Sequence, residues 1–149
     1  MKRLYQLLPL LLVFSAITAQ AQDKDNEVIV RDFISAWSRL NPSELASYFS
    51  EEGVYHNMPN EAVVGRSDIE QFIRGFIRPW ESTEWEVISL LADGDIVMVE
   101  RLDRTVVAGS PVNLQCLGYF ELTDGEITLW RDYFDLTTYT TALTAALAK

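Results

Sequence analysis

Two charged residues interrupt a strand-like, otherwise apolar stretch of the sequence. Arg101 and Asp103 are two residues apart, and Val97, Val99 and Thr105 continue the same spacing. Because alternate side chains of a strand leave the same face, all five are expected on one face. Carboxylates are rarely buried without a partner, and Arg101 supplies one. A buried carboxyl held by a guanidinium is a means of moving protons, although such a pair is also common as a structural salt bridge.

Two further polar groups lie in strand-like segments elsewhere in the chain. Asp132 shares a face with Trp130 and Phe134, so aromatic side chains flank it. Tyr55 and Asn57 share a face of an earlier strand, and their donors and acceptors could hold one water molecule in a fixed orientation. No pair is specific alone, and the functional hypothesis depends on the combination.

Three helices are predicted ahead of most of the strands. Apolar residues at helical spacing predict an amphipathic helix over residues 26–40. Asn41 as a cap, with Pro42 after it, begins a second helix that we expect to run through Phe49. A capping box at Ser67 predicts the start of a third helix, which ends before Pro79.

The second half of the chain is predicted to be a β-meander. Extended runs cover residues 84–91, 96–107, 112–122 and 127–134, and hairpin-turn residues separate them. A strand over residues 54–58 lies between the helices, and a short helix over residues 137–147 ends the chain. This order predicts an α+β domain whose sheet curls around a helix layer, with an apolar pocket at its open mouth.

The first 21 residues are typical of a secretory signal. Lys2 and Arg3 precede an apolar run over residues 7–17, and a small-residue cleavage site ends at Ala21. The run is too short for a membrane span, so we expect no stable membrane insertion after cleavage. Residues 22–149 then form a single exported domain, periplasmic or secreted.

Composition excludes several classes of partner and cofactor. The chain has 12 Lys and Arg against 22 Asp and Glu, a net charge of −10, and loss of Lys2 and Arg3 would make it −12. Such an acidic surface repels nucleic acid and anionic lipid headgroups. With one cysteine and one histidine the chain offers no zinc-type ligand set, so no metal is expected. Cys116, in an apolar strand, is expected to be a small buried residue.

The motifs together resemble the limonene-1,2-epoxide hydrolase family. The matching segments, in family order, are Tyr-His-Asn-Met-Pro at 55–59, Glu-Arg-Leu-Asp at 100–103, residues 114–125, and Trp-Arg-Asp-Tyr-Phe-Asp-Leu at 130–136. The resemblance covers most of the chain after the signal. It implies the cone of the nuclear transport factor 2 superfamily: a highly curved mixed sheet with helices packed into its concave face, usually as a homodimer.

The resemblance also implies a role for each polar residue. Asp132 would be the base that takes a proton from water, and Tyr55 and Asn57 would hold that water. Asp103 would be the acid that protonates the epoxide oxygen, and Arg101 would bridge the two carboxylates. No cofactor is implied, and the partners are a small apolar epoxide and water. We expect six residues to contact the substrate: Thr105, Leu114, Cys116, Phe134, Phe76 and Trp37.

Two other functions remain open from the sequence. A cone-fold isomerase or cyclase would use one aspartate to move a proton beside a carbonyl, with Tyr55 as the oxyanion donor. It gives Arg101 no evident role. A noncatalytic carrier would use the same pocket for an apolar ligand, since one scaffold hosts many functions. It leaves three buried charges without a purpose.

Overall fold

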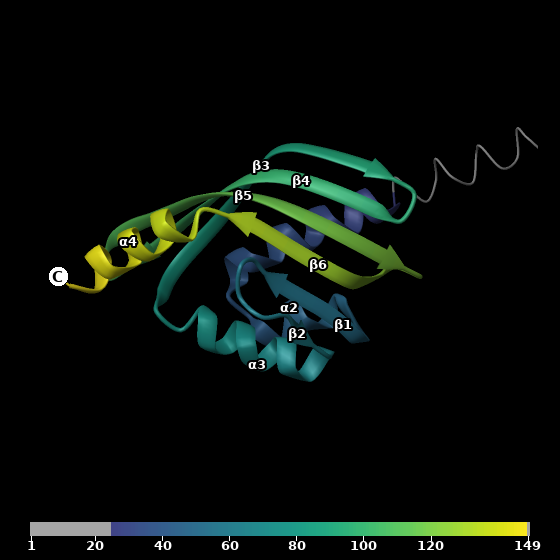
Figure 1. Ribbon diagram of the computed structural model, residues 1–149, viewed down its shortest axis with the longest axis horizontal. Helices are drawn as coiled ribbons and strands as arrows, with labels where there is room; N and C mark the ends of the chain where they lie inside the picture. The colour runs from purple at the N-terminus through teal and green to yellow at the C-terminus, as the bar shows by residue number, and fades with distance from the viewer. Residues whose placement is uncertain (1–24, 149) are drawn as a thin grey trace, which may run out of the picture.

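The fold is a six-stranded mixed sheet with helices on its inner face and at its end (Figure 1). The computed structural model describes residues 25–148. The strand order is β2-β1-β6-β5-β4-β3, and the sheet is curved and does not close. The strands are β1 (Phe49–Asn57), β2 (Val63–Val64), β3 (Trp80–Asp93), β4 (Ile96–Val107), β5 (Ser110–Thr123) and β6 (Glu126–Phe134). The helices are residues 25–36, continued by η1 (Trp37–Arg39), then α2 (Pro42–Ser47), α3 (Arg66–Phe76) and α4 (Leu136–Leu147).

Strands β3 to β6 form the predicted antiparallel meander. Gly94, Gly109 and Gly125 all have positive φ in the three connecting turns, a conformation that glycine adopts without strain. The burial pattern of β4 alternates along the strand, which confirms that Val97, Val99, Arg101, Asp103 and Thr105 share its inner face. Strand β3 starts at Trp80, four residues earlier than predicted, because it pairs with the far end of β4 at Val107.

The first strand pairs with the last in parallel, and this pairing makes the sheet mixed. β1 lies beside β6, with Tyr55 opposite Trp130 and Asn57 opposite Asp132. The short β2 pairs antiparallel with the other edge of β1. Residues from both halves of the chain therefore meet on one inner face.

The N-terminal helix lies in the concave face of the sheet and builds the core with it (Figure 1). Phe33 is wholly buried, with its ring centroid 5.1 Å from that of Trp130 and 6.0 Å from that of Phe120. Val97 and Val99 of β4 belong to the same core. At the other end of the sheet, α4 packs on Val107 and Val112 through Ala146.

Two of the helix predictions were wrong at their ends. The second helix stops at Ser47, and Phe49 instead opens β1, where it pairs with Ile127 and is wholly buried. Pairing in the sheet thus outweighs the local helical signal. The third helix begins at Arg66 rather than after a Ser67 cap, because Gly65 takes a positive φ and forms the N-cap. The predicted Asn41 cap of the second helix is confirmed, because Asn41 Oδ1 accepts from the Glu44 N–H. The last helix is capped by Asp135, whose Oδ1 accepts from the Thr138 N–H.

The signal segment predicted over residues 1–21 lies outside the described residues. Within residues 25–148, no helix has the length and apolar character needed to cross a membrane.

Candidate active site

Arg101 joins two aspartates on the inner face of the sheet. Its Nε donates to Asp103 Oδ1 at 2.8 Å, and its Nη2 donates to Asp103 Oδ2 at 3.2 Å. Toward β6, Nη1 donates to Asp132 Oδ1 at 2.8 Å and Nη2 to Asp132 Oδ2 at 2.5 Å. All three side chains are buried, and Arg101 has no exposed surface. The guanidinium therefore bridges the two carboxylates with two hydrogen bonds to each.

Aromatic rings and one glycine fix the position of the guanidinium. The Cζ of Arg101 lies 4.3 Å from the ring centroid of Trp85 and 5.6 Å from that of Trp130, both within range of a cation–π interaction. A Cβ at Gly118 would lie 3.0 Å from Arg101 Nη1 and 2.8 Å from Phe120 Cε2. Gly118 thus leaves the space that the guanidinium fills.

Trp85 is held in turn by its neighbours. It pairs with Asp103 across β3 and β4, so it lies beside the carboxyl as well as under the guanidinium. Its ring stacks on Trp37 at 4.2 Å, and its Nε1 donates to Thr83 Oγ1 at 3.0 Å. Thr83 Oγ1 is also 2.8 Å from Thr105 Oγ1. These contacts leave Trp85 little freedom to move away from Arg101.

The pair predicted to hold water lies beside Asp132, on the neighbouring strand. Tyr55 is buried, and its ring stacks on Trp130 at 4.2 Å. Asn57 pairs directly with Asp132 across β1 and β6. Its Oδ1 is buried without a hydrogen-bond partner among the described residues, so it can accept a bond from a molecule in the cavity.

The polar residues form one wall of a cavity. Tyr55, Asn57, Asp103 and Asp132 line it, and so do five of the six residues expected to contact substrate: Thr105, Leu114, Cys116, Phe134 and Phe76. The prediction for the sixth residue, Trp37, is corrected. Trp37 does not line the cavity but lies behind Trp85, with which it stacks. Four lining residues were not predicted as substrate contacts, namely Trp80, Trp85, Val112 and Tyr139.

Burial gives the ionisable groups of the site unusual proton affinities. Desolvation raises the pKa of Asp103 from 3.8 to about 6, and Arg101 only partly offsets this effect. Burial, together with the nearby charge of Asp132, raises the pKa of Tyr55 well above its usual value. Burial opposes the charge of Arg101, but Asp103 and Asp132 outweigh it and raise the pKa of the guanidinium. Arg101 thus remains a cation, and the Tyr55 hydroxyl keeps its proton.

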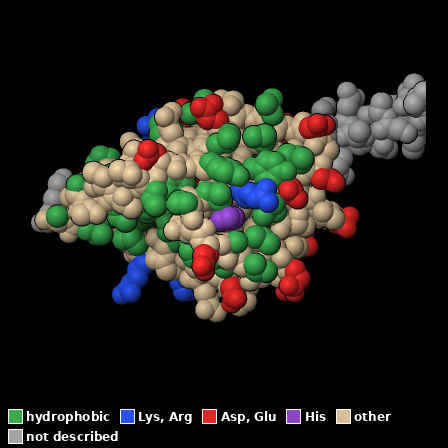
Figure 2. All heavy atoms as spheres, viewed as in Figure 1, with side chains coloured by type: hydrophobic (Ala, Val, Ile, Leu, Met, Phe, Trp, Pro, Cys, Tyr) green, Lys and Arg blue, Asp and Glu red, His purple; other side chains and the backbone are tan. Residues whose placement is uncertain are grey.

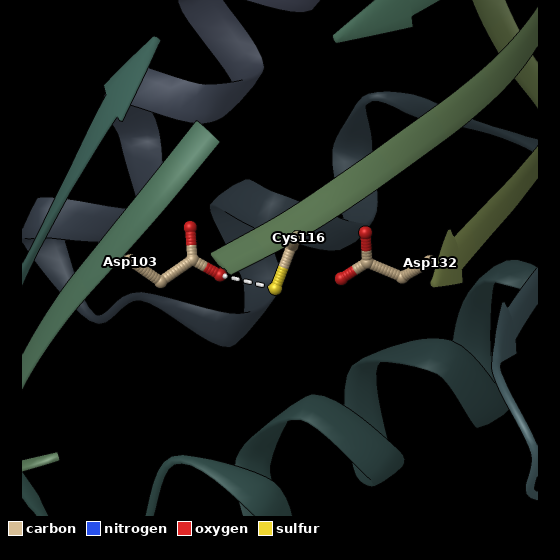
Figure 3. Close-up of side chains that lie close together, drawn as sticks. All are labelled: Asp103, Cys116 and Asp132. Carbon is tan, nitrogen blue, oxygen red and sulfur yellow. Dashed lines mark hydrogen bonds between the residues drawn. The ribbon is translucent and has the colours of Figure 1, made fainter. Parts of the chain in front are cut away.

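Cys116 lies between the two aspartates (Figure 3). Its Sγ and one oxygen of each carboxylate all lie within 4.8 Å of one another, close enough to be considered as metal ligands. Arg101 already donates to all four carboxylate oxygens. Burial also raises the pKa of the Cys116 thiol, whereas a metal binds the thiolate. The chemistry of these three side chains therefore favours the binding of Arg101 over the binding of a metal ion.

Comparison with known proteins identifies the family of the chain. The model of the limonene-1,2-epoxide hydrolase catalytic domain matches residues 24–145. The epoxide hydrolase EphG of Mycobacterium tuberculosis is 49% identical over 107 residues, which are 72% of this chain and 71% of that protein.

Solved structures of similar proteins have the same fold. An LEH-like epoxide hydrolase from M. tuberculosis matches with a TM-score of 0.72 and 26% identity, covering 85% of this chain and 94% of that one. A protein of ketosteroid isomerase-like fold from Catenulispora acidiphila matches with a TM-score of 0.71 and 22% identity, covering 78% and 92%. The second likeness concerns the fold alone. The matched domain includes every residue of the bridged carboxylate site, and the chain belongs to the limonene-1,2-epoxide hydrolase family.

Proposed function

We propose that this protein hydrolyses an apolar epoxide to a vicinal diol in one step, with water as the nucleophile. The observation that carries the proposal is the arginine bridge, which holds two buried carboxylates at the wall of a largely apolar cavity. An epoxide needs its oxygen protonated while a carbon is attacked, and two carboxylates in opposite protonation states meet both needs.

The proton transfers assign one task to each aspartate. Asp132 accepts a proton from the water, which Tyr55 and Asn57 orient. The water oxygen forms a bond to one ring carbon as the bond from that carbon to the epoxide oxygen breaks. Asp103 gives its proton to that oxygen, so the product carries two hydroxyl groups. One proton must then return from Asp132 to Asp103, and both carboxylates contact the same Nη2 of Arg101.

The pKa of Asp103 predicts a pH dependence for this reaction. Burial raises this pKa to about 6, so the carboxyl keeps its proton at a pH where an ordinary aspartate has lost it. The acid form disappears as the pH rises through this value, and kcat/KM should fall on that side. A rate that rises steadily from pH 5 to pH 9 would contradict the assignment of Asp103 as the acid.

The cavity favours a compact apolar substrate. Phe76, Trp80, Phe134 and Tyr139 supply aromatic surface, and the carboxylates lie at one wall. Aromatic walls bury hydrocarbon without leaving polar groups unpaired. The substrate class we propose is an epoxide whose carbon skeleton is cyclic or aryl and carries no charge.

The deciding experiment is a diol assay on purified protein with cyclic and styrene-type epoxides in ¹⁸O-labelled water. We expect one labelled oxygen in each diol. Asp132→Asn should lower kcat by about 10²- to 10⁴-fold, the usual contribution of a general base. Asp124→Asn is the matched control, because Asp124 is an exposed turn residue and the substitution makes the same chemical change.

The other outcomes distinguish the alternatives. A rearranged carbonyl product without solvent oxygen would indicate an isomerase or cyclase. Tight binding of the epoxide without turnover, equal in the wild type and Asp132→Asn, would indicate a carrier. Unchanged diol formation by Asp132→Asn would overturn the assignment of the base.

We also propose that the protein forms a homodimer through the outer face of the sheet. Met98, Leu117 and Tyr133 lie on adjacent strands of this face, and each is more than one-third exposed. Leu117 and Tyr133 are direct partners in the register. Hydrophobic side chains also gather over the face viewed in Figure 2. Light scattering of the wild type and of Leu117→Glu tests the proposal, and a monomeric wild type would contradict it.

Export is proposed on the N-terminal pattern of residues 1–21 alone. The test is to express the full chain and determine the N-terminus of the accumulated protein. A mature chain that begins at Gln22 supports export, and an intact Met1 in the cytoplasmic fraction contradicts it.

A further inference from the structure

The hydrogen bonds of Arg101 do not by themselves distinguish the two aspartates. Arg101 makes two hydrogen bonds to Asp103 and two to Asp132, so it favours the ionised form of both. The acid must also release its proton during the reaction, and a group that contacts only one of the two carboxyls can assist that release.

Cys116 is such a group. Its Sγ donates to Asp103 Oδ2 at 3.3 Å across the β4–β5 pairing (Figure 3). Cys116 is directly opposite Arg101 in the strand register, so its side chain reaches the carboxyl from the strand next to β4. The residue is buried, with 4% of its surface exposed, and it lines the cavity. No hydrogen bond joins it to Asp132 among the described residues.

We propose that Cys116 is a positioning residue for the acid, whose S–H holds the Asp103 carboxyl and stabilises the carboxylate left after the proton has moved to the epoxide oxygen. The assignment of Asp103 as that acid rests on the proposed function. The hydrogen bond itself does not, and it can be tested without any turnover.

A general acid must hold its proton until the reaction begins and then release it. Burial raises the pKa of Asp103, the charge of Asp132 raises it further, and the donors Arg101 and Cys116 lower it. A general acid works best when its pKa lies near the working pH, because an acid that binds its proton too tightly is a poor donor. Cys116 thus limits how far burial can strengthen the hold of Asp103 on its proton.

The thiol suits this task because it stays protonated. Burial raises the pKa of Cys116, and although Arg101 opposes this, the charges of Asp103 and Asp132 add to it. The thiolate is the form that attacks electrophiles such as epoxides. A thiol that donates to a carboxylate can therefore lie in the wall of an epoxide pocket without becoming a nucleophile.

The first test uses the S–H stretching band in the Raman spectrum of the protein without substrate. Cys116 is the only cysteine, so the band reports on one bond. We expect it to shift to higher wavenumber as the pH falls through about 6, since a protonated Asp103 is a weaker acceptor. Asp103→Asn should abolish this pH dependence, whereas Asp124→Asn should keep it. A band that does not change with pH, or responds equally in Asp103→Asn, overturns the proposal.

The second test compares Cys116→Ala with Cys116→Ser, which have nearly the same volume and differ in one hydroxyl donor. In Cys116→Ala the pKa of Asp103 should rise, so the alkaline limb of kcat/KM should move up by roughly half a unit to one unit. The maximal kcat should fall about threefold to tenfold, the effect of one lost hydrogen bond. Cys116→Ser should return both values toward the wild type.

Val112→Ala is the control for altered cavity volume, because Val112 lines the cavity on the same strand and makes no polar contact. It should change KM and leave the alkaline limb in place. A Cys116→Ala limb that coincides with the wild type, or that matches Cys116→Ser, overturns the proposal. If no epoxide is hydrolysed but the Raman band follows the Asp103 titration, the proposed function fails and the hydrogen bond remains.

Discussion

The two ends of the inner sheet face are made from the same strands and have opposite character. In the first half of β4, Val97 and Val99 pack against Phe33 of the N-terminal helix in a dry core. In the second half of the same strand, Asp103 lines a cavity and accepts a hydrogen bond from the buried Arg101. The N-terminal helix covers the first end, whereas α4 and the end of α3 border the second (Figure 1).

The two ends of the sheet face contribute differently to the stability of the fold. At the dry end the burial of apolar surface stabilises the fold directly, and shape is the main constraint. At the other end, desolvation of Asp103 and Asp132 costs free energy that Arg101 must offset. The first end therefore stabilises the fold. The second end lowers the free energy of unfolding, because it keeps a carboxyl in its acid form.

The largest expected effect comes from removing the central group of each end. Arg101→Gln leaves two buried carboxylates without a counter-charge, and Phe33→Ala leaves a cavity among aromatic rings. Each should lower the free energy of unfolding by about 3–5 kcal/mol near neutral pH. Urea unfolding measured from pH 4 to pH 8 separates the two causes.

The pH dependence of the two losses should differ. The folded-state pKa of Asp103 already lies above its ordinary value, and without Arg101 it should rise further, so the loss is small near pH 4 and grows as the pH rises. The Phe33→Ala loss should be the same at every pH. An Arg101→Gln loss that is constant with pH would show that the bridge is a packing element rather than a charge balance.

A smaller effect is expected for Asp103→Asn. The folded-state pKa of about 6 exceeds the ordinary 3.8, so the stability that Asp103 contributes is fully present below about pH 4 and is lost as the pH rises through 6. This loss amounts to about 3 kcal/mol. Asp103→Asn should lack it, so the unfolding free energy of the variant should fall less between pH 4 and pH 7. Equal changes in the two proteins would contradict the raised pKa.

The smallest effects are expected at two glycines that differ in their surroundings. Gly118→Ala places a methyl group against Arg101 and Phe120, which should destabilise by about 1–3 kcal/mol and reduce kcat by moving the guanidinium. Gly75 lies in α3 with nothing within 4 Å of an added Cβ. Gly75→Ala should stabilise by about 0.5–1 kcal/mol and leave kcat unchanged. Thermal unfolding and the diol assay test both, and a Gly118→Ala enzyme with normal kcat would show that the bridge tolerates displacement.

Sequence patterns predicted the meander and the side of β4 on which the charges lie. Alternation with a period of two is a local property, so it placed Arg101 and Asp103 on the buried face correctly. The turns were equally clear, because Gly94, Gly109 and Gly125 meet a local backbone requirement. The helix ends were less predictable. Phe49 and Gly65 take their conformations from pairing between segments that no short window contains.

The supports of the site could not be predicted, for the same reason. Trp85 lies under Arg101 because the pairing of β3 with β4 places it opposite Asp103. Gly118 matters only because the guanidinium passes beside it. Tyr139 reaches the cavity because α4 folds back over β5. Trp37 has the spacing of a pocket residue, yet a second tryptophan stands in front of it. Nothing in the composition of these segments distinguishes a wall residue from one behind the wall.

The parallel pairing of β1 with β6 has a consequence for the order of folding. The hairpins of β4, β5 and β6 join neighbouring segments, so Arg101, Asp103 and Asp132 can come together through short loop closures. Asn57 reaches Asp132 only when a strand about half the chain length away docks beside β6. Long-range closures of this kind are slow steps. A refolding experiment should therefore recover the protection of the β4–β6 amides before that of β1, and the proposed water site at Asn57 should be the last part of the site to form.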